Sequence, residues 1–194
     1  MGNIEERRSI RKYRDKNIET EKIETILNAA LQAPSPKNRQ PWRFVVITDQ
    51  NEKKKMVTSM REKIGMLLQE KGKRKDIYAS FETLDVIEEA PVFILICYKY
   101  GTAKYHDDGI KWKISAKDLE VIELQAIGAA VENMLLKAEE LGLGSLWCAD
   151  IFYAYDVVAP YSADIVVSGV CLGYKNELPL ARPRNSISEM CKYI

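Results

Sequence analysis

The chain contains 194 residues, of which 46% are hydrophobic and 29% are charged. A chain of this length can bury well over half of the surface that it exposes when unfolded, so we expect one globular domain over residues 1–194 and exclude a disordered or collagen-like chain. Its 29 lysines and arginines nearly balance 28 acidic residues, which leaves a net charge of +1. Since this charge gives no general attraction to nucleic acid or anionic lipid, an anion would need a local cluster of cations.

Hydrophobic spacing in the first hundred residues predicts one helix and two buried strands. Apolar residues recur at helical spacing between Glu19 and Ala33, and Pro34 ends this helix. The runs Phe44–Ile47 and Val92–Tyr98 are short and apolar and are bounded by turn residues, as buried strands are. The longer run is about a third of the roughly 20 residues that cross a bilayer, so no membrane association is expected.

The second half of the chain predicts a long helix and two further strands. The helix Asp118–Leu141 is apolar on most of its circumference, which is typical of a central helix or one at a subunit interface, and Gly142 is expected to end it in the left-handed conformation. Ser145–Cys148 and Ile165–Gly173 are predicted to be strands. Helices and buried strands in this order predict an α+β domain with a central sheet, whose strand order periodicity does not give.

The four cysteines lie far apart in the sequence: Cys97, Cys148, Cys171 and Cys191. They form no C-x-x-C or metal-binding spacing, and the N-terminal residues lack the apolar stretch of a secretion signal. We therefore expect free thiols and a cytoplasmic location. The single histidine, His106, lies in a polar, turn-like stretch and is expected at the surface, so no metal site is predicted.

Motifs of several common enzyme classes are absent from the sequence. There is no G-x-S-x-G motif for a nucleophilic serine, and neither glycine-rich phosphate-binding motif occurs. Any phosphate must therefore be held by side chains. Candidates are the arginines of Arg7–Arg11 together with Arg182 and Arg184, because guanidinium groups bind phosphate in a bidentate manner. The rigid polar loop Pro34–Trp42, between a helix and a buried strand, is a second candidate for ligand binding.

Taken together, these motifs resemble the nitroreductase family of FMN-dependent oxidoreductases. The resemblance rests on segments that follow the family's order along nearly the whole chain: Arg7–Arg11, Ala33–Phe44, Gly128–Leu146, Trp147–Asp150, Leu172–Tyr174 and Arg182–Arg184. Residues 53–117 offer no position that matches. The resemblance implies a mainly antiparallel central sheet flanked by helices, and an intertwined homodimer that binds two FMN molecules across its interface.

The resemblance also assigns roles to the arginine-rich segments. Arg7 and Ser9 resemble contacts to the phosphate and ribityl chain of FMN, with Arg8 contributing largely through its backbone. Arg11 resembles a cation near the flavin pyrimidine, where a fixed positive charge makes the flavin easier to reduce. At the other end of the chain, Arg182 and Arg184 resemble a phosphate clamp.

Two loops complete the implied site. Residues matching the loop that reaches the flavin from the other subunit are Pro34, Ser35, Pro36 and Asn38. Ala149 and Asp150 resemble the loop whose backbone N–H faces flavin N5, although some relatives have a Glu-Gly pair there. Candidates for an aromatic wall over the flavin, or simply for strand, loop and interface aromatics, are Tyr98, Tyr100, Tyr105 and Trp112.

The implied function is that of an NAD(P)H oxidoreductase with no dedicated catalytic side chain. NADH or NADPH would reduce FMN, and hydride would pass from flavin N5 to a nitroaromatic, quinone or activated alkene in a ping-pong cycle. One alternative is a flavin-binding carrier or sensor without meaningful turnover. Another is an RNA-contacting module that uses Arg7–Arg14 and Lys71–Lys75, although Lys53–Lys55 and Lys71–Lys75 are more simply solvated helix ends or loops. We expect no nucleic-acid partner.

Overall fold

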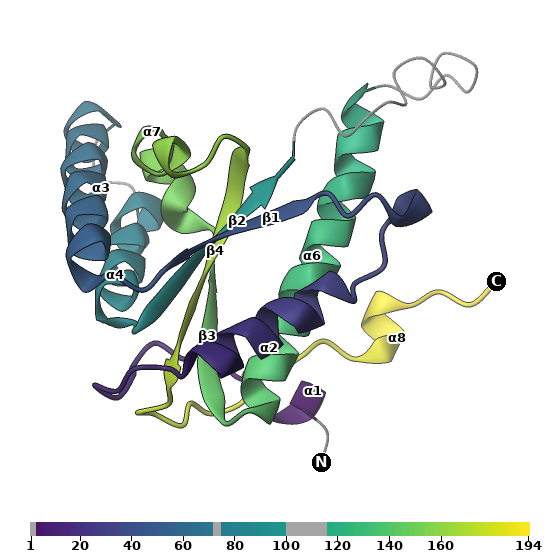
Figure 1. The fold of residues 1–194 in the computed structure, drawn as a ribbon. Helices are drawn as coiled ribbons and strands as arrows, with labels where there is room; N and C mark the ends of the chain where they lie inside the picture. The colour runs from purple at the N-terminus through teal and green to yellow at the C-terminus, as the bar shows by residue number, and fades with distance from the viewer. Residues whose placement is uncertain (1–2, 72–74, 100–115) are drawn as a thin grey trace.

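The computed structural model describes residues 3–71, 75–99 and 116–194. Four strands form one sheet in the order β1-β2-β4-β3, and each neighbouring pair is antiparallel (Figure 1). The strands are β1 (Trp42–Ile47), β2 (Val92–Tyr98), β3 (Leu143–Cys148) and β4 (Ile165–Tyr174). This confirms the antiparallel central sheet and each of the four strands predicted from hydrophobic runs.

Helices of very different lengths surround the sheet. The longer ones are α2 (Thr20–Leu31), α3 (Gln50–Lys71), α4 (Lys75–Glu89) and α6 (Ala116–Glu140). The short ones are α1 (Asn3–Glu6), η1 (Pro36–Asn38), η2 (Asp150–Ala154), α7 (Tyr155–Val158), η3 (Ala159–Tyr161) and α8 (Ile187–Met190). The two predicted helices correspond to α2 and α6, and Gly142 follows α6 with the expected positive φ of 73°.

Helices cover both faces of the sheet, and this explains the unbroken apolar sequence of β2. In Figure 1, α3, α4 and α7 lie on one side, and α2 and α6 lie on the other. Phe93, Leu95 and Cys97 belong to the core under α3 and α4, whereas Ile94 and Ile96 belong to the core under α2 and α6. Since successive strand residues point to opposite faces, a strand between two cores must be apolar at every position.

The basic run at Lys53 corrects one expectation. Lys53 is buried rather than solvated, and its ammonium group donates a hydrogen bond to the Ala90 carbonyl. Burial lowers the pKa of Lys53 to about 8. Lys54 and Lys55 are exposed as expected, so the run is split between the core and solvent by the turn of α3.

The structure also addresses the predictions of free thiols and of no membrane-spanning helix. All four cysteines are free, and the buried Cys148 and Cys171 place their sulfur atoms 3.7 Å apart on neighbouring strands. Among the residues that the structure describes, no helix is long and apolar enough to cross a membrane.

Candidate functional site

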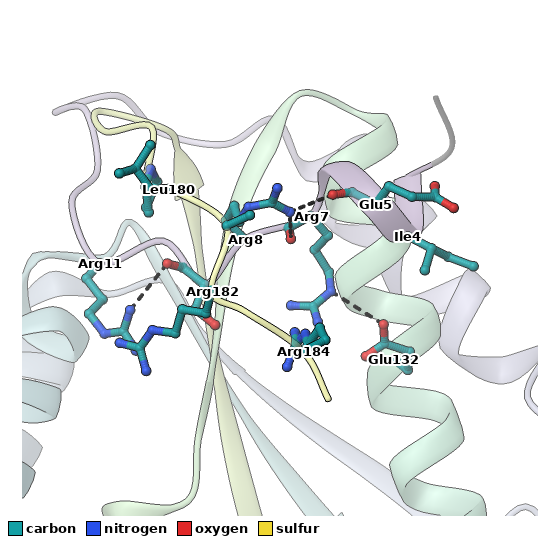
Figure 2. A pocket seen from close by; sticks show the side chains of 12 residues that line it. Ile4, Glu5, Arg7, Arg8, Arg11, Glu132, Leu180, Arg182 and Arg184 are labelled. Carbon is teal, nitrogen blue, oxygen red and sulfur yellow. Dashed lines mark hydrogen bonds and ion pairs between the residues drawn. The ribbon is translucent and has the colours of Figure 1, made fainter. Parts of the chain in front are cut away.

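A pocket of about 710 Å³ lies where the N-terminal segment meets the C-terminal tail (Figure 2). It brings together arginines from both ends of the sequence, and its lining residues are Ile4, Glu5, Arg7, Arg8, Ser9, Arg11, Glu132, Pro179, Leu180, Ala181, Arg182 and Arg184. A cluster of guanidinium groups in one hollow suits an anionic ligand. Six of the twelve residues assigned to FMN by resemblance therefore share one pocket of a single protomer: Arg7, Arg8, Ser9, Arg11, Arg182 and Arg184.

Two glycines let the N-terminal segment lie directly on the edge of the sheet. A Cβ atom on Gly144 would lie 2.8 Å from carbon atoms of the Ile10 side chain, and one on Gly173 would lie 2.5 Å from the Tyr13 ring. Both approaches are closer than a side chain tolerates. The Ile10 N–H donates to the Ser145 carbonyl at 2.9 Å, so residues 7–11 are fixed beside β3.

The arginines of this pocket already make contacts within the chain. Arg7 Nε lies 3.4 Å from Glu132 Oε1, whereas Arg8 Nη1 donates to the carbonyls of Glu5 and Arg7 at 2.6 and 2.8 Å. Arg11 Nη1 makes a weaker contact of 3.4 Å with the Ser9 carbonyl. The contact between Arg7 and Glu132 is long and partly exposed, so an anion in the pocket can replace Glu132 as the partner of Arg7. The side chain of Arg8 instead stabilises the N-terminal turn, and its backbone role toward FMN stays a prediction.

The loop 34–41 does not line the arginine pocket of its own protomer. Pro34, Pro36 and Asn38 are exposed, whereas the Ser35 hydroxyl accepts a hydrogen bond from the Gln40 N–H at 3.0 Å. Ser35 thus shapes the loop through its side chain. The exposed residues are the ones available to a ligand or to another subunit.

A buried polar cluster anchors this loop, and sequence reasoning missed it. Glu123 of α6 is 3% exposed; its Oε1 lies 2.5 Å from Arg39 Nε, and its Oε2 accepts a hydrogen bond from the Tyr98 hydroxyl at 2.6 Å. Burial and the neighbouring carboxylate raise the pKa of Tyr98 well above its ordinary value. Tyr98 is therefore a buried strand residue and not part of an aromatic wall. The one available signal was a glutamate among the apolar residues of the long helix predicted at Asp118–Leu141.

The loop after β3 is hydrogen-bonded to α4, on the face of the sheet opposite to α2 and α6. Ala149 is exposed, and the carboxylate of Asp150 accepts a hydrogen bond from the Thr83 hydroxyl of α4 at 2.8 Å. Neither residue lines the arginine pocket. The other candidates, His106, Tyr100, Tyr105 and Trp112, lie outside the described residues.

Helix α6 separates the loop from the pocket. Glu123 contacts the loop and Glu132 contacts the pocket, and nine positions separate them in the sequence. Nine residues make about two and a half helical turns, so the two side chains leave opposite faces of α6, about 13 Å apart along its axis. One protomer thus holds the loop and the pocket on different sides of the same helix, with η1 and α1 near opposite ends of α6 (Figure 1).

The chain is similar in sequence and in fold to known proteins. Residues 4–174 match the model of the nitroreductase family. A protein of Archaeoglobus fulgidus, provisionally named NADH dehydrogenase/NAD(P)H nitroreductase, is 35% identical over 73% of this chain and 62% of its own length. The chain therefore spans about three-fifths of that relative.

Two solved structures extend the likeness over almost the whole fold. A BluB-like flavoprotein from Clostridium difficile 630 has a TM-score of 0.83 and 27% identity, with 99% of this chain and 97% of the other covered. A provisionally named nitroreductase from Desulfovibrio desulfuricans, solved in complex with FMN, has a TM-score of 0.73 and 26% identity over 99% and 94% of the two chains. With a family model that covers most of its residues and a relative at 35% identity, this chain belongs to the nitroreductase family.

Proposed function

We propose that this protein is an FMN-dependent NAD(P)H oxidoreductase that transfers hydride to an electrophilic acceptor, such as a nitroaromatic, a quinone or an activated alkene. The observation that carries the proposal is the pocket in which arginines from the two ends of the chain meet. The FMN bound by the Desulfovibrio relative and the NAD(P)H named for the Archaeoglobus relative support it. When bound, FMN supplies the redox chemistry, and the protein supplies position and electrostatics.

The donor set of the pocket fits the phosphate of FMN. Arg7, Arg182 and Arg184 offer forked N–H donors, and the Ser9 hydroxyl adds a smaller one. Arg11 would place a positive charge near the pyrimidine edge, where charge accumulates on two-electron reduction. The backbone N–H after β3, at Ala149 or Asp150, would face N5. No side chain in this scheme acts as acid or base, which agrees with a family whose cofactor carries the reaction.

The remaining contacts would come from a second subunit, in a homodimer. Loop 34–41 and the arginine pocket lie on opposite faces of α6 in one protomer, so a flavin in the pocket would meet the loop of the partner. Val121 and Ile122 of α6 are 46% and 38% exposed, and apolar residues of the C-terminal tail are also exposed: Leu178, Leu180, Ile187 and Met190. Such surfaces favour burial against another copy of the chain.

The visible absorbance spectrum of the purified protein tests this proposal directly. We expect a flavin band that bleaches on anaerobic addition of NADH or NADPH and returns when a quinone or nitroaromatic is added in stoichiometric amounts. Initial rates with both substrates varied should give the parallel lines of a ping-pong cycle. A band that persists with either nicotinamide would support a carrier or sensor instead. No binding of added FMN would overturn the proposal.

Light scattering of the FMN-bound protein tests the dimer. A mass near twice the 22.2 kDa of the chain is expected. A monomer that keeps its FMN would contradict a site shared between subunits.

A further inference from the structure

We propose that Glu123 is a positioning residue for the flavin: through Arg39 it fixes loop 34–41 in the conformation that reaches the FMN of the partner subunit. The inference rests on the proposed function of the arginine pocket and adds a residue that lies outside that pocket. It assigns a role to a buried charge cluster that neither the sequence motifs nor the phosphate contacts explain.

Both oxygens of the Glu123 carboxylate are engaged. Arg39 Nε lies 2.5 Å from Oε1, and the Tyr98 hydroxyl donates to Oε2 at 2.6 Å. The side chains of Arg39 and Glu123 are only 11% and 4% exposed. Because separating a buried pair leaves uncompensated charge away from water, Arg39 is held in one place. Its backbone, and therefore the loop, is held with it.

The loop needs such an anchor because its backbone is strained. Lys37, Asn38 and Gln40 have positive φ values of 51°, 55° and 50°, in the left-handed region that L-residues seldom adopt. Residues in this conformation persist only where the surrounding structure imposes it. Arg39 lies between Asn38 and Gln40 in the sequence. Its ion pair therefore holds the part of the loop whose backbone conformation is strained.

Two other hydrogen bonds close the loop and hold its end. The Gln40 N–H donates to Ser35 Oγ at 3.0 Å within the loop, and the Lys99 N–H donates to the Pro41 carbonyl at 2.9 Å at its end. Arg39 supplies the ion pair to the helix. Without it, we expect the loop to keep its ends but to lose the orientation of Asn38 and its neighbours.

Cross-subunit complementation separates this role from ordinary stabilisation. Glu123→Gln should impair the loop of its own chain, and Arg7→Ala with Arg184→Ala should impair the pocket of its own chain. In a mixed dimer of these two chains, one site combines an intact pocket with an intact loop, and the other combines both defects. If the loop acts on the partner, the mixed dimer regains one FMN site of wild-type affinity per two chains, whereas each parent homodimer has none.

The supporting measurements are FMN titration by flavin fluorescence and the visible spectrum of the bound flavin. We expect Glu123→Gln to weaken FMN binding by about 10- to 100-fold, the range of one or two lost charge-assisted contacts, and to shift the flavin band. Arg39→Met should do the same while keeping most of the side-chain volume. Glu120→Gln, an exposed glutamate one turn earlier in α6, is the matched control and should change neither quantity.

The outcomes distinguish this inference from the proposed function. Wild-type protein that binds no FMN overturns the proposed function itself. Wild-type protein that binds FMN, with Glu123→Gln and Arg39→Met matching its affinity and spectrum, overturns only the role of Glu123. Lower thermal stability of these variants with unchanged flavin binding likewise overturns the role of Glu123 alone. Complementation that yields no wild-type site would place the loop and pocket contacts in one subunit and contradict the proposal.

Discussion

Helix α6 carries two glutamates that each pair with an arginine, in very different surroundings. The Glu123–Arg39 pair is buried, with 4% and 11% of the side chains exposed and 2.5 Å between the charged atoms. The Glu132–Arg7 pair is open, with 43% and 22% exposed and a separation of 3.4 Å. The same two residue types thus make a buried contact in the first half of the helix and an open contact in its second half.

Solvation explains the difference. Breaking a buried ion pair leaves a charge without water, so the pair persists through binding and release of a ligand. An exposed pair contributes at most about 1 kcal/mol, and water or another anion can replace either partner. Glu132 is therefore suited to hold Arg7 until a phosphate takes its place, whereas Glu123 is suited to hold a loop permanently. The predictions below test this contrast.

The largest expected effect comes from removing the buried carboxylate. Glu123→Ala should lower the free energy of unfolding by about 3 kcal/mol, because it leaves the Arg39 charge buried without its carboxylate. Urea denaturation of the FMN-free protein measures this. The paired control, Glu132→Ala, should cost less than about 1 kcal/mol because water replaces the carboxylate. If both variants lose the same free energy of unfolding, burial does not make the Glu123–Arg39 pair contribute more to stability than the Glu132–Arg7 pair.

The open pair lies in the arginine pocket for which we propose FMN binding, so the next largest expected effect is on the affinity for FMN. Arg7→Ala combined with Arg184→Ala should raise the Kd for FMN by roughly 100-fold or more, since each contact to a charged group contributes about 1.5–3 kcal/mol. The protein should lose its yellow colour during purification and unfold at the same urea concentration as FMN-free wild-type protein, since bound FMN itself stabilises the folded state. Full retention of FMN by this variant would count decisively against the phosphate assignment.

Parts of the fold and of the candidate site could be predicted from the sequence, whereas the buried ion pair could not. The strands and α6 were predictable because burial on both sides demands long apolar runs, as in Val92–Tyr98. The arginines of the pocket could be found because they recur in short motifs near both ends of the chain. Helices α3 and α4 were not predicted, since charged residues interrupt their apolar faces. The Arg39–Glu123 contact joins residues 84 positions apart, and nothing local in the sequence links them.

Neutralising the open carboxylate should have a smaller effect and the opposite sign. Glu132→Gln removes a competitor for Arg7, so FMN should bind more tightly, by up to about fivefold, because an exposed ion pair contributes at most about 1 kcal/mol. The gain should shrink at high ionic strength because salt screens exposed charges. FMN titrations at low and high salt measure it. Weaker binding by this variant would instead show that Glu132 orients Arg7 for the phosphate.

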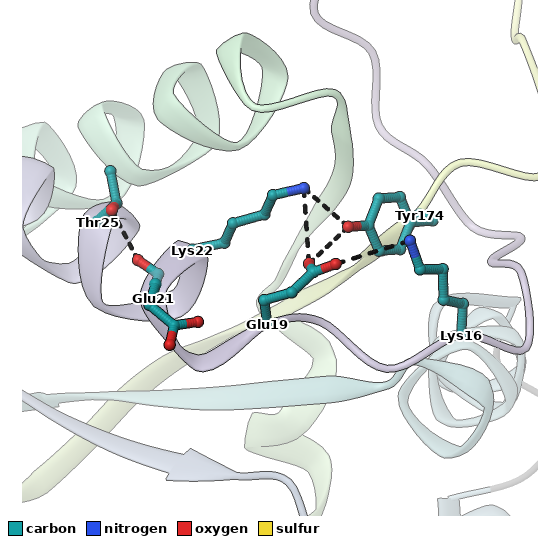
Figure 3. A network of polar contacts seen from close by, with 6 residues as sticks. All are labelled: Lys16, Glu19, Glu21, Lys22, Thr25 and Tyr174. Carbon is teal, nitrogen blue, oxygen red and sulfur yellow. Dashed lines mark hydrogen bonds and ion pairs between the residues drawn. The ribbon is translucent and has the colours of Figure 1, made fainter.

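The smallest effect concerns a third carboxylate, Glu19, which is exposed to solvent beside Tyr174 (Figure 3). The Tyr174 hydroxyl donates to Glu19 Oε2 at 2.6 Å, and the ammonium groups of Lys22 and Lys16 lie 3.5 and 3.7 Å from its oxygens. This hydrogen bond is the main cause that lowers the pKa of Glu19 to about 2, and a backbone hydrogen bond and the two lysines lower it further.

A lowered carboxyl pKa stabilises the folded state at pH values above the ordinary pKa of 4.5, and this stabilisation is lost as the pH falls from there toward 2. Tyr174→Phe removes the hydroxyl donor, so the pKa of Glu19 should rise toward its ordinary value in a carboxyl NMR titration. The loss of stability between pH 4.5 and pH 2 should then become shallower, as it should in the control variant Glu19→Gln. An unchanged titration in Tyr174→Phe would assign the shift to the backbone hydrogen bond and the two lysines, and contacts at the solvent-exposed surface would then suffice to hold this carboxylate ionised without the tyrosine hydroxyl.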